Sequence, residues 1–349
     1  MTDVSKLTAD NILAIAVDKP ELLFTGDTTI AKMQYRTLVS AWHPDQNPMV
    51  DDRVIAHINI LYELATFRLK TDNWVLPGVL VLKSIDGKRF NLKYKSTRSF
   101  ELGDIYVGDT IIAYSLFKDN ADLFKNAIKM IKNLKYANDE MKTEIKRSMP
   151  EIQTELETDD RLVLLIKKTP DQLLLSDVID HLKGSIDPKH AAWIVSRLYN
   201  LACYLKYSNI VHCGFVLDSC LMSPQEHTIS LVGGWWYSVE NGRKLLALPG
   251  VAIDHVPTDV LDDEMGDFSL DLEMIKAIGR QILGDINGSK LIMDKNIPGP
   301  LVNWLRNVAT EDAFKEYEIW QSKVLIDSFG KRKFVELHLA ADDLYGAKK

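Results

Sequence analysis

The sequence has few cysteines, no long apolar run and no excess of basic charge. Its cysteines, Cys203, Cys213 and Cys220, are odd in number and lack CxxC spacing, which favours reduced thiols in a cytoplasmic protein. No run approaches the ~18 apolar residues that a membrane span requires, so we expect no membrane partner. A net charge of −7 argues against a nucleic-acid partner. The first residues also lack the basic and apolar regions of a secretory signal.

Several enzyme signatures are missing as well. The sequence contains no HExxH, no GxSxG and no zinc-type spacing of Cys and His, so we expect no metal site. It has no internal repeat and no low-complexity tract. With 46% hydrophobic and 26% charged residues, the composition is ordinary for a globular protein. A length of 349 residues predicts two or three folding units.

Charge is unevenly distributed along the chain. Residues 83–147 are rich in lysine and arginine, whereas residues 254–273 are heavily acidic. We interpret both stretches as solvated faces of a folded unit rather than as binding patches.

Residues 1–72 carry helical patterns on both sides of a short loop. Thr8 can cap a short helix that Pro20 breaks. A second helix opens at Gly26-Asp27-Thr28, and Pro44 ends it. A third helix follows Asp51-Asp52, with apolar residues three or four apart: Val54, Ile58, Leu61, Tyr62, Ala65 and Leu69. This pattern predicts two antiparallel helices joined by a loop.

That loop reads Trp42-His43-Pro44-Asp45-Gln46-Asn47-Pro48. Tyr35-Arg36-x-Leu38 precedes it, and Ile58-Asn59 and then Tyr62 follow it. The whole resembles the YRxLA…HPD…INxAY pattern of J domains, the co-chaperone modules that drive ATP hydrolysis in DnaK-type chaperones. The resemblance implies such a chaperone as partner, docked by the loop and the basic face of the second helix: Lys32, Tyr35, Arg36, His43, Pro44 and Asp45.

Basic charge is sparser here than in most J domains. The places where the family often carries lysine or arginine hold Met33, Thr37, Ala41 and Gln46. We therefore expect weaker electrostatic steering, visible in the association rate and its salt dependence. Two alternatives remain: a chance helix–turn–helix loop, or a J-like domain that has lost its coupling to a chaperone.

Residues 73–349 show strand patterns first and helical patterns afterwards. A hairpin is predicted at Val79–Leu82 and Phe90–Tyr94 around Asp86-Gly87. Further strands are predicted at Phe100–Val107, Thr110–Leu116 and Ala127–Ile131, and a connector at Lys167–Asp171 leads into helices. This order predicts an α+β fold with two lobes, at about 75–167 and 171–349.

This order of elements is joined by Ala127-x-Lys129 on the third predicted strand and by a loop that reads Val211-His212 through Ser223-Pro224, then Leu231-Val232 and Trp236-Tyr237-Ser238-Val239. With the first two features the second module resembles a protein kinase, and with the loop the whole chain resembles bacterial or bacteriophage J-domain proteins fused to a kinase-like domain. The resemblance implies a J-like domain at 1–72 and a kinase-like domain at 73–349. It makes Lys129 the strand lysine that contacts nucleotide phosphates and Glu144 its helix partner; the alternative is an ordinary surface ion pair. Asp271 with Gly279 resembles the family's helix-anchoring D-x-W-x-x-G segment.

The positions that carry kinase chemistry are replaced. His212-Cys213-Gly214 stands in place of H-R-D, so that Gly214 replaces the catalytic aspartate. Ser219 lies at about the position where kinases carry the metal-binding asparagine, and Gly234 lies where they carry the aspartate that binds magnesium. Phosphoryl transfer depends on magnesium and a positioned aspartate, so we expect a pseudokinase with no metal and at most weak ATP binding. Asp218 as a substitute acid is the alternative.

The expected function is therefore that of a non-enzymatic J-domain co-chaperone or adaptor. It would recruit and stimulate a DnaK-type chaperone, while the pseudokinase contacts an unknown client or partner protein. The alternatives are an atypical phosphotransferase using Lys129, Glu144 and Asp218, or a nucleotide-binding switch without chemistry. Trp235-Trp236-Tyr237 is interpreted as core packing rather than as a binding platform.

Overall fold

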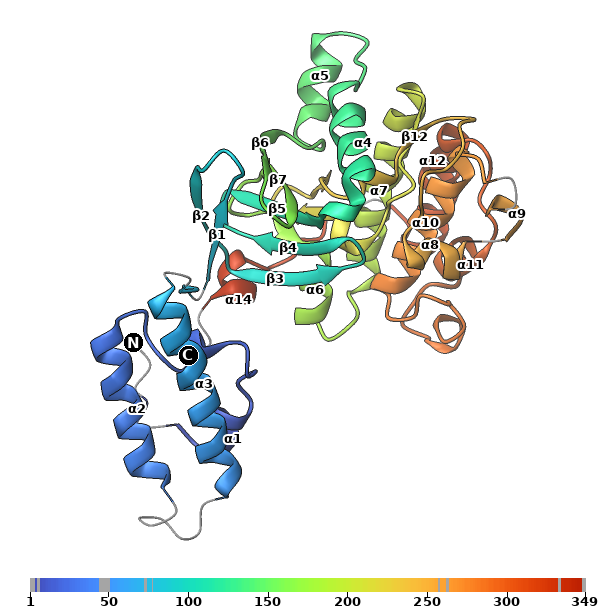
Figure 1. Cartoon of the computed structure of the whole chain (residues 1–349). Coiled ribbons are helices and arrows are strands. Elements are labelled where there is room, and N and C mark those ends of the chain that lie inside the picture. The colour runs from blue at the N-terminus through green and yellow to red at the C-terminus, as the bar shows by residue number, and fades with distance from the viewer. Residues whose placement is uncertain are drawn as a thin grey trace. The chain divides into compact units, whose positions relative to one another are not determined.

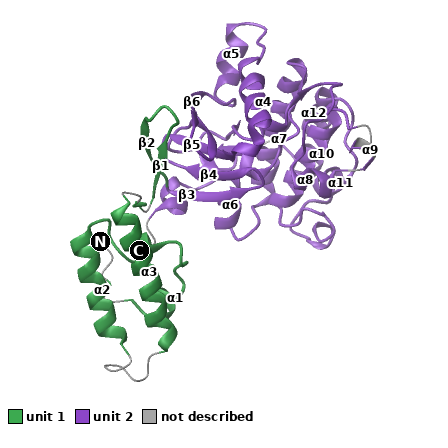
Figure 2. Ribbon diagram, viewed as in Figure 1, with its two compact units in different colours: residues 1–94 green, residues 95–349 purple. Residues whose placement is uncertain are grey.

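The structure, a computed structural model, describes residues 4, 7–43, 51–71, 74–76, 78–256, 258–261, 264–331 and 334–346. The chain divides into two compact units, residues 1–94 and 95–349 (Figure 2). Helices and sheets both build the fold, which agrees with the predicted mixed α and β composition. Within the described ranges, no helix has both the length and the apolar character needed to cross a membrane.

The first unit contains a hairpin of two helices, α2 (Thr28–Trp42) and α3 (Asp52–Lys70) (Figure 1). Each helix begins where the sequence predicts, at an aspartate whose carboxylate accepts a backbone N–H of the first turn. Asp27 accepts from Ile30 at 2.8 Å, and Asp51 accepts from Arg53 at 2.9 Å. Two short elements precede the hairpin, α1 (Ala9–Leu13) and the 3-10 turn η2 (Pro20–Leu22).

One apolar face of each helix forms the core of this unit. The buried positions of α3 recur every three or four residues, as the predicted helix requires: Val54, Ile58, Leu61 and Ala65. They belong to one buried cluster with Ala31 and Leu38 of α2, Ile12 of α1, and Leu23. The periodic apolar pattern therefore places the core of the hairpin correctly.

The predicted hairpin of strands is confirmed as β1 (Val79–Lys83) and β2 (Arg89–Lys93). These strands are antiparallel and form a two-stranded sheet of their own. Gly87 in the turn has φ +83°, the left-handed conformation that an Asp-Gly turn requires. The hairpin falls within the unit 1–94 and not, as predicted above, within a module that begins at residue 73.

The second unit begins with a five-stranded antiparallel sheet in the order β3-β4-β5-β7-β6. The strands are β3 (Ser96–Phe100), β4 (Gly103–Val107), β5 (Ile111–Phe117), β6 (Ile152–Glu157) and β7 (Arg161–Lys167). The chain between β5 and β6 forms η3 (Lys118–Asn120), α4 (Ala121–Lys132) and α5 (Asp139–Lys146). Figure 1 shows α4 lying beside this sheet.

Two strand predictions in this region are wrong. Phe100–Val107 is not one strand, because the chain turns at Glu101-Leu102 between β3 and β4. Gly103 makes this turn possible, since a side chain there would collide with the backbone of Ser115 on β5. Ala127–Ile131 is not a strand either but part of α4, whose buried residues have helical spacing: Phe124, Ala127, Met130 and Ile131.

The rest of the second unit is mostly helical. The long helix α7 (Pro188–Tyr207) is capped by the Asp187 side chain and packs beside the almost entirely buried α10 (Phe268–Ile282). The other helical elements are α6 (Leu175–His181), η4 (Leu217–Ser219), η5 (Trp235–Tyr237), α8 (Gly250–His255), α9 (Thr258–Leu261), η6 (Leu291–Met293), α11 (Gly299–Arg306), α12 (Ala313–Ile319), the π-helical η7 (Trp320–Val324), α13 (Leu325–Phe329) and α14 (Ala341–Tyr345). Short strands complete the unit: β8 (Leu173–Leu174), β9 (Ile210–Val211), β10 (Cys220–Ser223), β11 (Thr228–Leu231) and β12 (Val239–Glu240).

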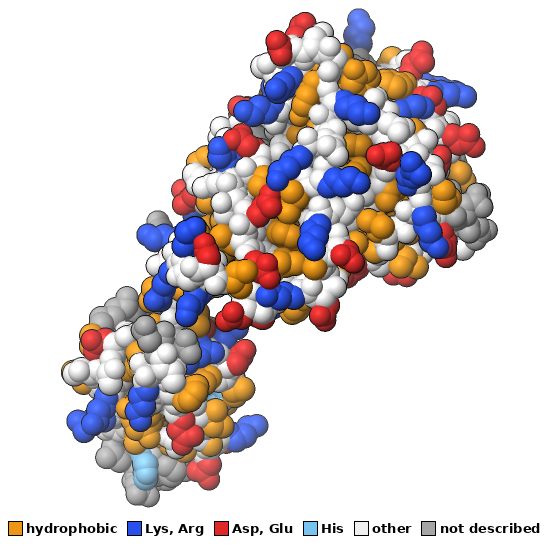
Figure 3. Space-filling view, turned by 45° about the horizontal axis from the view of Figure 1, so that its top comes forward, with side chains coloured by type: hydrophobic (Ala, Val, Ile, Leu, Met, Phe, Trp, Pro, Cys, Tyr) orange, Lys and Arg blue, Asp and Glu red, His pale blue; other side chains and the backbone are white. Residues whose placement is uncertain are grey.

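The charged surface of the second unit is mixed in sign. On the face shown in Figure 3, lysine and arginine side chains are interspersed with aspartate and glutamate side chains. Basic residues of the 83–147 stretch form ion pairs with carboxylates, as at Lys118–Glu157 (3.0 Å) and Lys132–Glu155 (2.9 Å). This arrangement fits our interpretation of the basic stretch as a solvated face.

Candidate functional site

The helical hairpin of the first unit is held by an aromatic pair with a hydrogen bond. The rings of Tyr35 on α2 and Tyr62 on α3 are stacked, with centroids 3.9 Å apart. The Tyr35 hydroxyl donates to Oδ1 of Asn59 at 2.9 Å. Tyr35, assigned above to chaperone docking, therefore lies half-buried between the helices. Its contacts set the spacing of α2 and α3 at the positions that lead to and from the loop.

His43 lies at the end of α2, where the backbone leaves the helix in an extended conformation with φ −74° and ψ 134°. It is half-buried. Pro44 and Asp45, the other two residues of the tripeptide, lie outside the described residues. The structure thus describes the helix that leads to the loop and the helix that follows it.

The outer face of α2 combines basic and apolar side chains. Lys32 and Arg36 are both exposed and lie four residues apart, so they share one face of the helix. Met33 beside them is 62% exposed. An exposed face with two cations and a flexible apolar side chain is suited to contact with another protein.

The predicted pairing of Lys129 with Glu144 is wrong. Lys129 lies on α4 and not on a strand, and its side chain is exposed. Glu144 lies exposed on α5 and pairs with Arg147 of the same helix at 3.3 Å. The cause is the misassigned strand at 127–131. This pair therefore gives no geometric support to a vestigial nucleotide site.

The loop that begins at His212 is anchored by Asp271 of α10. The backbone N–H groups of His212 and Cys213 each donate to a carboxylate oxygen of Asp271, both at 2.8 Å. Asp271 thus anchors the start of this loop to α10. Gly279, eight positions further along α10, lies where a side chain would meet Leu305 at 2.6 Å. Asp271 therefore holds the His212 loop, and the absence of a side chain at Gly279 lets Leu305 pack close to α10.

Burial shifts the pKa values of both ionisable side chains at this anchor. Desolvation raises the pKa of Asp271 to about 7, although the two N–H donors act in the opposite direction. Desolvation also lowers the pKa of His212 to about 3, so its imidazole is neutral at neutral pH. Its Nδ1 accepts the backbone N–H of Gly214 at 3.2 Å, and its ring packs against Trp235. His212 is therefore a packing residue of the loop.

Gly214 and Gly234 lie backbone against backbone. An added Cβ on Gly214 would come within 2.6 Å of the Gly234 carbonyl oxygen, and one on Gly234 within 2.5 Å of the Gly214 carbonyl oxygen. Gly234 also has φ +78°, a conformation that glycine favours. The structure thus brings together two positions where the resemblance to kinases would place aspartates, and it leaves no space for a side chain on either.

Ser219 serves the backbone of its own loop. Its hydroxyl donates to the carbonyl of Val216 at 2.7 Å and accepts the N–H of Val216 at 3.1 Å. Its carbonyl accepts the N–H groups of Val232 and Gly233. These bonds join the loop to the segment that carries Gly234.

A cavity of 250 Å³ lies beside these loops, under the five-stranded sheet. Aromatic rings dominate its lining. The Trp236 ring lies 5.3 Å from that of Phe100 and 5.1 Å from that of Tyr114. The Tyr114 hydroxyl donates to the carbonyl of Asp218 at 2.9 Å. Burial, with the nearby charge of Asp218, raises the pKa of Tyr114, so the phenol stays neutral.

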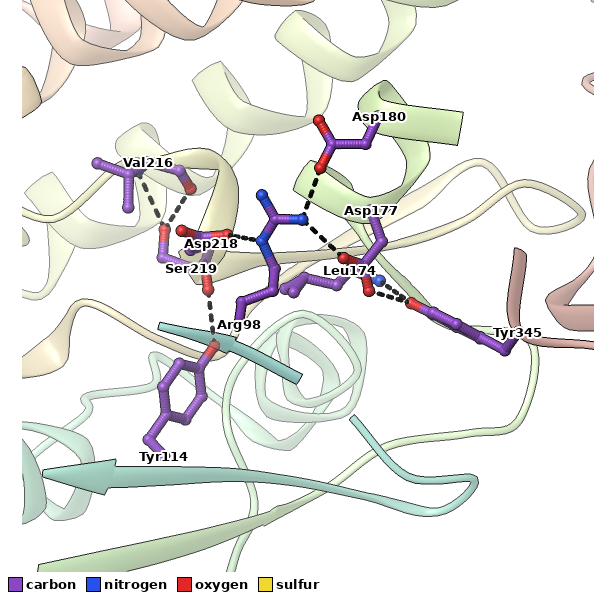
Figure 4. Close-up of polar contacts among 9 residues, drawn as sticks. All are labelled: Arg98, Tyr114, Leu174, Asp177, Asp180, Val216, Asp218, Ser219 and Tyr345. Carbon is purple, nitrogen blue, oxygen red and sulfur yellow. Dashed lines mark hydrogen bonds and ion pairs between the residues drawn. The ribbon is translucent and has the colours of Figure 1, made fainter. Parts of the chain in front are cut away.

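Arg98 on β3 joins the sheet to three carboxylates (Figure 4). Its guanidinium lies 3.0 Å from Asp177, 2.6 Å from Asp180 and 3.2 Å from Asp218. Burial alone would lower the pKa of Arg98, but the three carboxylates outweigh it and raise the pKa. The Tyr345 hydroxyl also donates to Asp177, at 3.0 Å. The network thus fixes Asp218 beside the cavity and involves the C-terminal helix α14.

Glu101 in the β3–β4 turn makes a second connection from the sheet, to α8 and η5. Its carboxylate accepts the backbone N–H of Gly250 at 2.6 Å and the hydroxyl of Tyr237 at 3.2 Å. No sequence pattern points to Glu101, Arg98 or Tyr114 as residues of the site. Each lies on an ordinary strand or turn, and its partners are far away in sequence, for example 149 positions for Glu101 and Gly250. No local motif signals such contacts.

The chemistry open to this site is limited by its residues. In the described part of the chain, no group of three or more His, Cys, Asp and Glu side chains is arranged to hold a metal ion. Carboxylates are present at Asp218 and Glu101, but Arg98 neutralises the former.

No protein-family model and no curated protein sequence matches the chain.

Proposed function

We propose that the protein is a co-chaperone adaptor whose first unit is a J-like domain that stimulates a DnaK-type chaperone. The observation that carries the proposal is the placement of His43 at the end of α2, in a hairpin fixed by the Tyr35–Tyr62 stack. The exposed Lys32 and Arg36 on the same helix would dock against an acidic partner surface. Tyr35 would position the hairpin and leave the contact to its neighbours.

We infer that the second unit is a kinase-like scaffold that contacts a client or another protein. Two features support this: an antiparallel five-stranded sheet with α4 inserted after its third strand, and the Asp271 anchor under the His212 loop. The contact between Gly214 and Gly234 supports a scaffold without phosphotransfer. The phosphotransferase alternative used Lys129, Glu144 and Asp218, and the nucleotide switch used Lys129. Lys129 and Glu144 lie on exposed helix faces and do not line the cavity, whereas Asp218 lines it in an ion pair with Arg98.

The test is the ATP turnover of a DnaK-type chaperone with and without the full chain. We expect wild type to raise turnover above the basal rate and His43→Gln to abolish the increase. His338→Gln is the matched control, because His338 is 82% exposed at its side chain and lies in the second unit. It should stimulate like wild type. Turnover at the basal rate with wild type would refute the chaperone role.

The docking face has its own test within this assay. Reversing the charge with Lys32→Glu or Arg36→Glu should raise the concentration needed for half-maximal stimulation, and added salt should weaken stimulation by wild type. Lys70→Glu, on α3, is the control for net charge. Equal effects of all three substitutions would show that α2 is not the docking face.

A further inference from the structure

The cavity under the five-stranded sheet is lined by aromatic rings and acids. Phe100 and Tyr114 come from the sheet, and Trp236 and Tyr237 come from η5. We propose that this cavity binds a small organic cation of the alkylammonium class. The proposal stands independently of whether the first unit couples to a chaperone.

The acidic side of the cavity is formed by Glu101. In the described structure both donors to its carboxylate, the Gly250 N–H and the Tyr237 hydroxyl, are neutral, so its negative charge has no cationic partner. Asp218 also lines the cavity, and its charge is shared with Arg98. The charged side chains that line the cavity are therefore both acidic, and only that of Asp218 is paired with a cation.

The described part of the cavity lining carries acidic but no basic side chains. None of the described residues that line it is a lysine or an arginine. The nearest cation of the network, Arg98, already contacts three carboxylates. A phosphate-bearing ligand would meet uncompensated negative charge at Glu101, which disfavours a nucleotide and favours a cation.

The aromatic rings of the lining are the second source of attraction for a cation. A cation over the face of Trp, Tyr or Phe is attracted by the ring quadrupole, and quaternary ammonium groups are recognised in this way by several rings together. Alkylation also makes an ammonium group less costly to desolvate than a primary amine, which suits a mostly apolar site. A cavity of 250 Å³ is below the roughly 300 Å³ at which pockets for drug-sized ligands begin. The occupant is therefore a small group.

The Trp236 indole favours a ligand that carries a hydrogen-bond acceptor. Its buried Nε1–H makes no hydrogen bond of good geometry among the described residues, although it interacts with the nearby Tyr237 hydroxyl. A ligand oxygen that accepts from it with good geometry would add affinity. An alkylammonium group with a hydroxyl or ether oxygen a short chain away meets both requirements. Choline is the simplest probe of this kind.

The experiment compares three probes by calorimetry on the full chain. Choline should bind, whereas 3,3-dimethylbutan-1-ol, its uncharged isostere, and magnesium–ATP should not. Equal binding of choline and the isostere would overturn the cation assignment. Tighter binding of magnesium–ATP than of choline would overturn the proposal entirely.

Variants locate the site. Glu101→Gln should weaken choline binding about tenfold or more, the equivalent of losing one charge contact, while the exposed control Glu226→Gln should bind like wild type. Phe100→Leu, which keeps an apolar side chain and removes a ring, should weaken binding independently. Unchanged affinity in both Glu101→Gln and Phe100→Leu, with wild-type circular dichroism, would place any choline site elsewhere and refute the assignment.

Discussion

Gly214 and Gly234, two positions where the resemblance to kinases would place aspartates, lie backbone against backbone. Because their backbones touch, an alanine at Gly214 must displace the Gly234 peptide and should lower the free energy of unfolding by about 1–3 kcal/mol. Gly234→Ala should cost more, since φ +78° adds strain of about 1–2 kcal/mol. Chemical denaturation of the full chain measures both.

Gly242→Ala is the matched control for that prediction. Gly242 has a similar φ, +72°, but open space around its Cα, so its substitution reports the strain alone. Equal losses at Gly234 and Gly242 would show that the backbone contact is unimportant. By the same geometry, Gly214→Asp and Gly234→Asp together should unfold the loop region rather than create phosphotransferase activity.

Asp271 offers a prediction with a defined pH dependence. Its two oxygens each accept one N–H, whereas asparagine has a single acceptor, so Asp271→Asn leaves one buried donor unpaired and should cost about 1–3 kcal/mol. Because the folded-state pKa is raised from 3.8 to about 7, Asp271 contributes stability that is full below pH 3.8 and lost as pH rises through 7. Wild type should therefore exceed the variant by more at pH 5 than at pH 8.

The readout is the unfolding free energy of both proteins at the two pH values. His212, whose pKa is lowered to about 3, has the opposite pH dependence: its stability is present above its ordinary value of 6.5 and lost as pH falls towards 3. That contribution is common to both proteins and cancels in the comparison. A difference independent of pH would mean that Asp271 is ionised throughout this range.

The elements that sequence patterns predicted correctly are those whose signals are local. Asp27 and Asp51 cap α2 and α3 one or a few residues from the groups they bind, and the apolar period of α3 lies within one helix. The β1–β2 turn is likewise set by Asp86-Gly87. Caps, turns and period depend on neighbouring residues, so a single sequence is enough to place them.

The errors fall where a short apolar run is ambiguous or where a contact is long-range. Ala127–Ile131 is almost continuously apolar, so it fits either a strand or a buried helix segment, and the structure has α4. The β3–β4 turn depends on Gly103 against Ser115, a contact that only the assembled sheet creates. Arg98 likewise meets its partners 79 and 82 positions away. The resemblance to kinase motifs singles out Gly214 and Gly234, but nothing in the sequence predicts that their backbones touch.

Each of the two units has its own buried cluster, one drawn from residues 4–65 and one from residues 105–339. Separate cores favour separate unfolding, so we expect two thermal transitions in the full chain. Tyr35→Phe removes the hydrogen bond to Asn59 and should lower only the first unit's transition, by an amount equivalent to about 0.5–1.5 kcal/mol. Gly214→Ala should lower only the second unit's transition.

The double variant then measures coupling between the units. Substitutions in independent units add, so the double variant should reproduce each single shift, whereas coupled units give a non-additive result. Calorimetry assigns each transition through comparison with the fragment 1–94. A single transition that both substitutions move would show that the units unfold together. In that case any ligand of the second unit would alter the stability of the helices that carry His43, and the two units would respond as one.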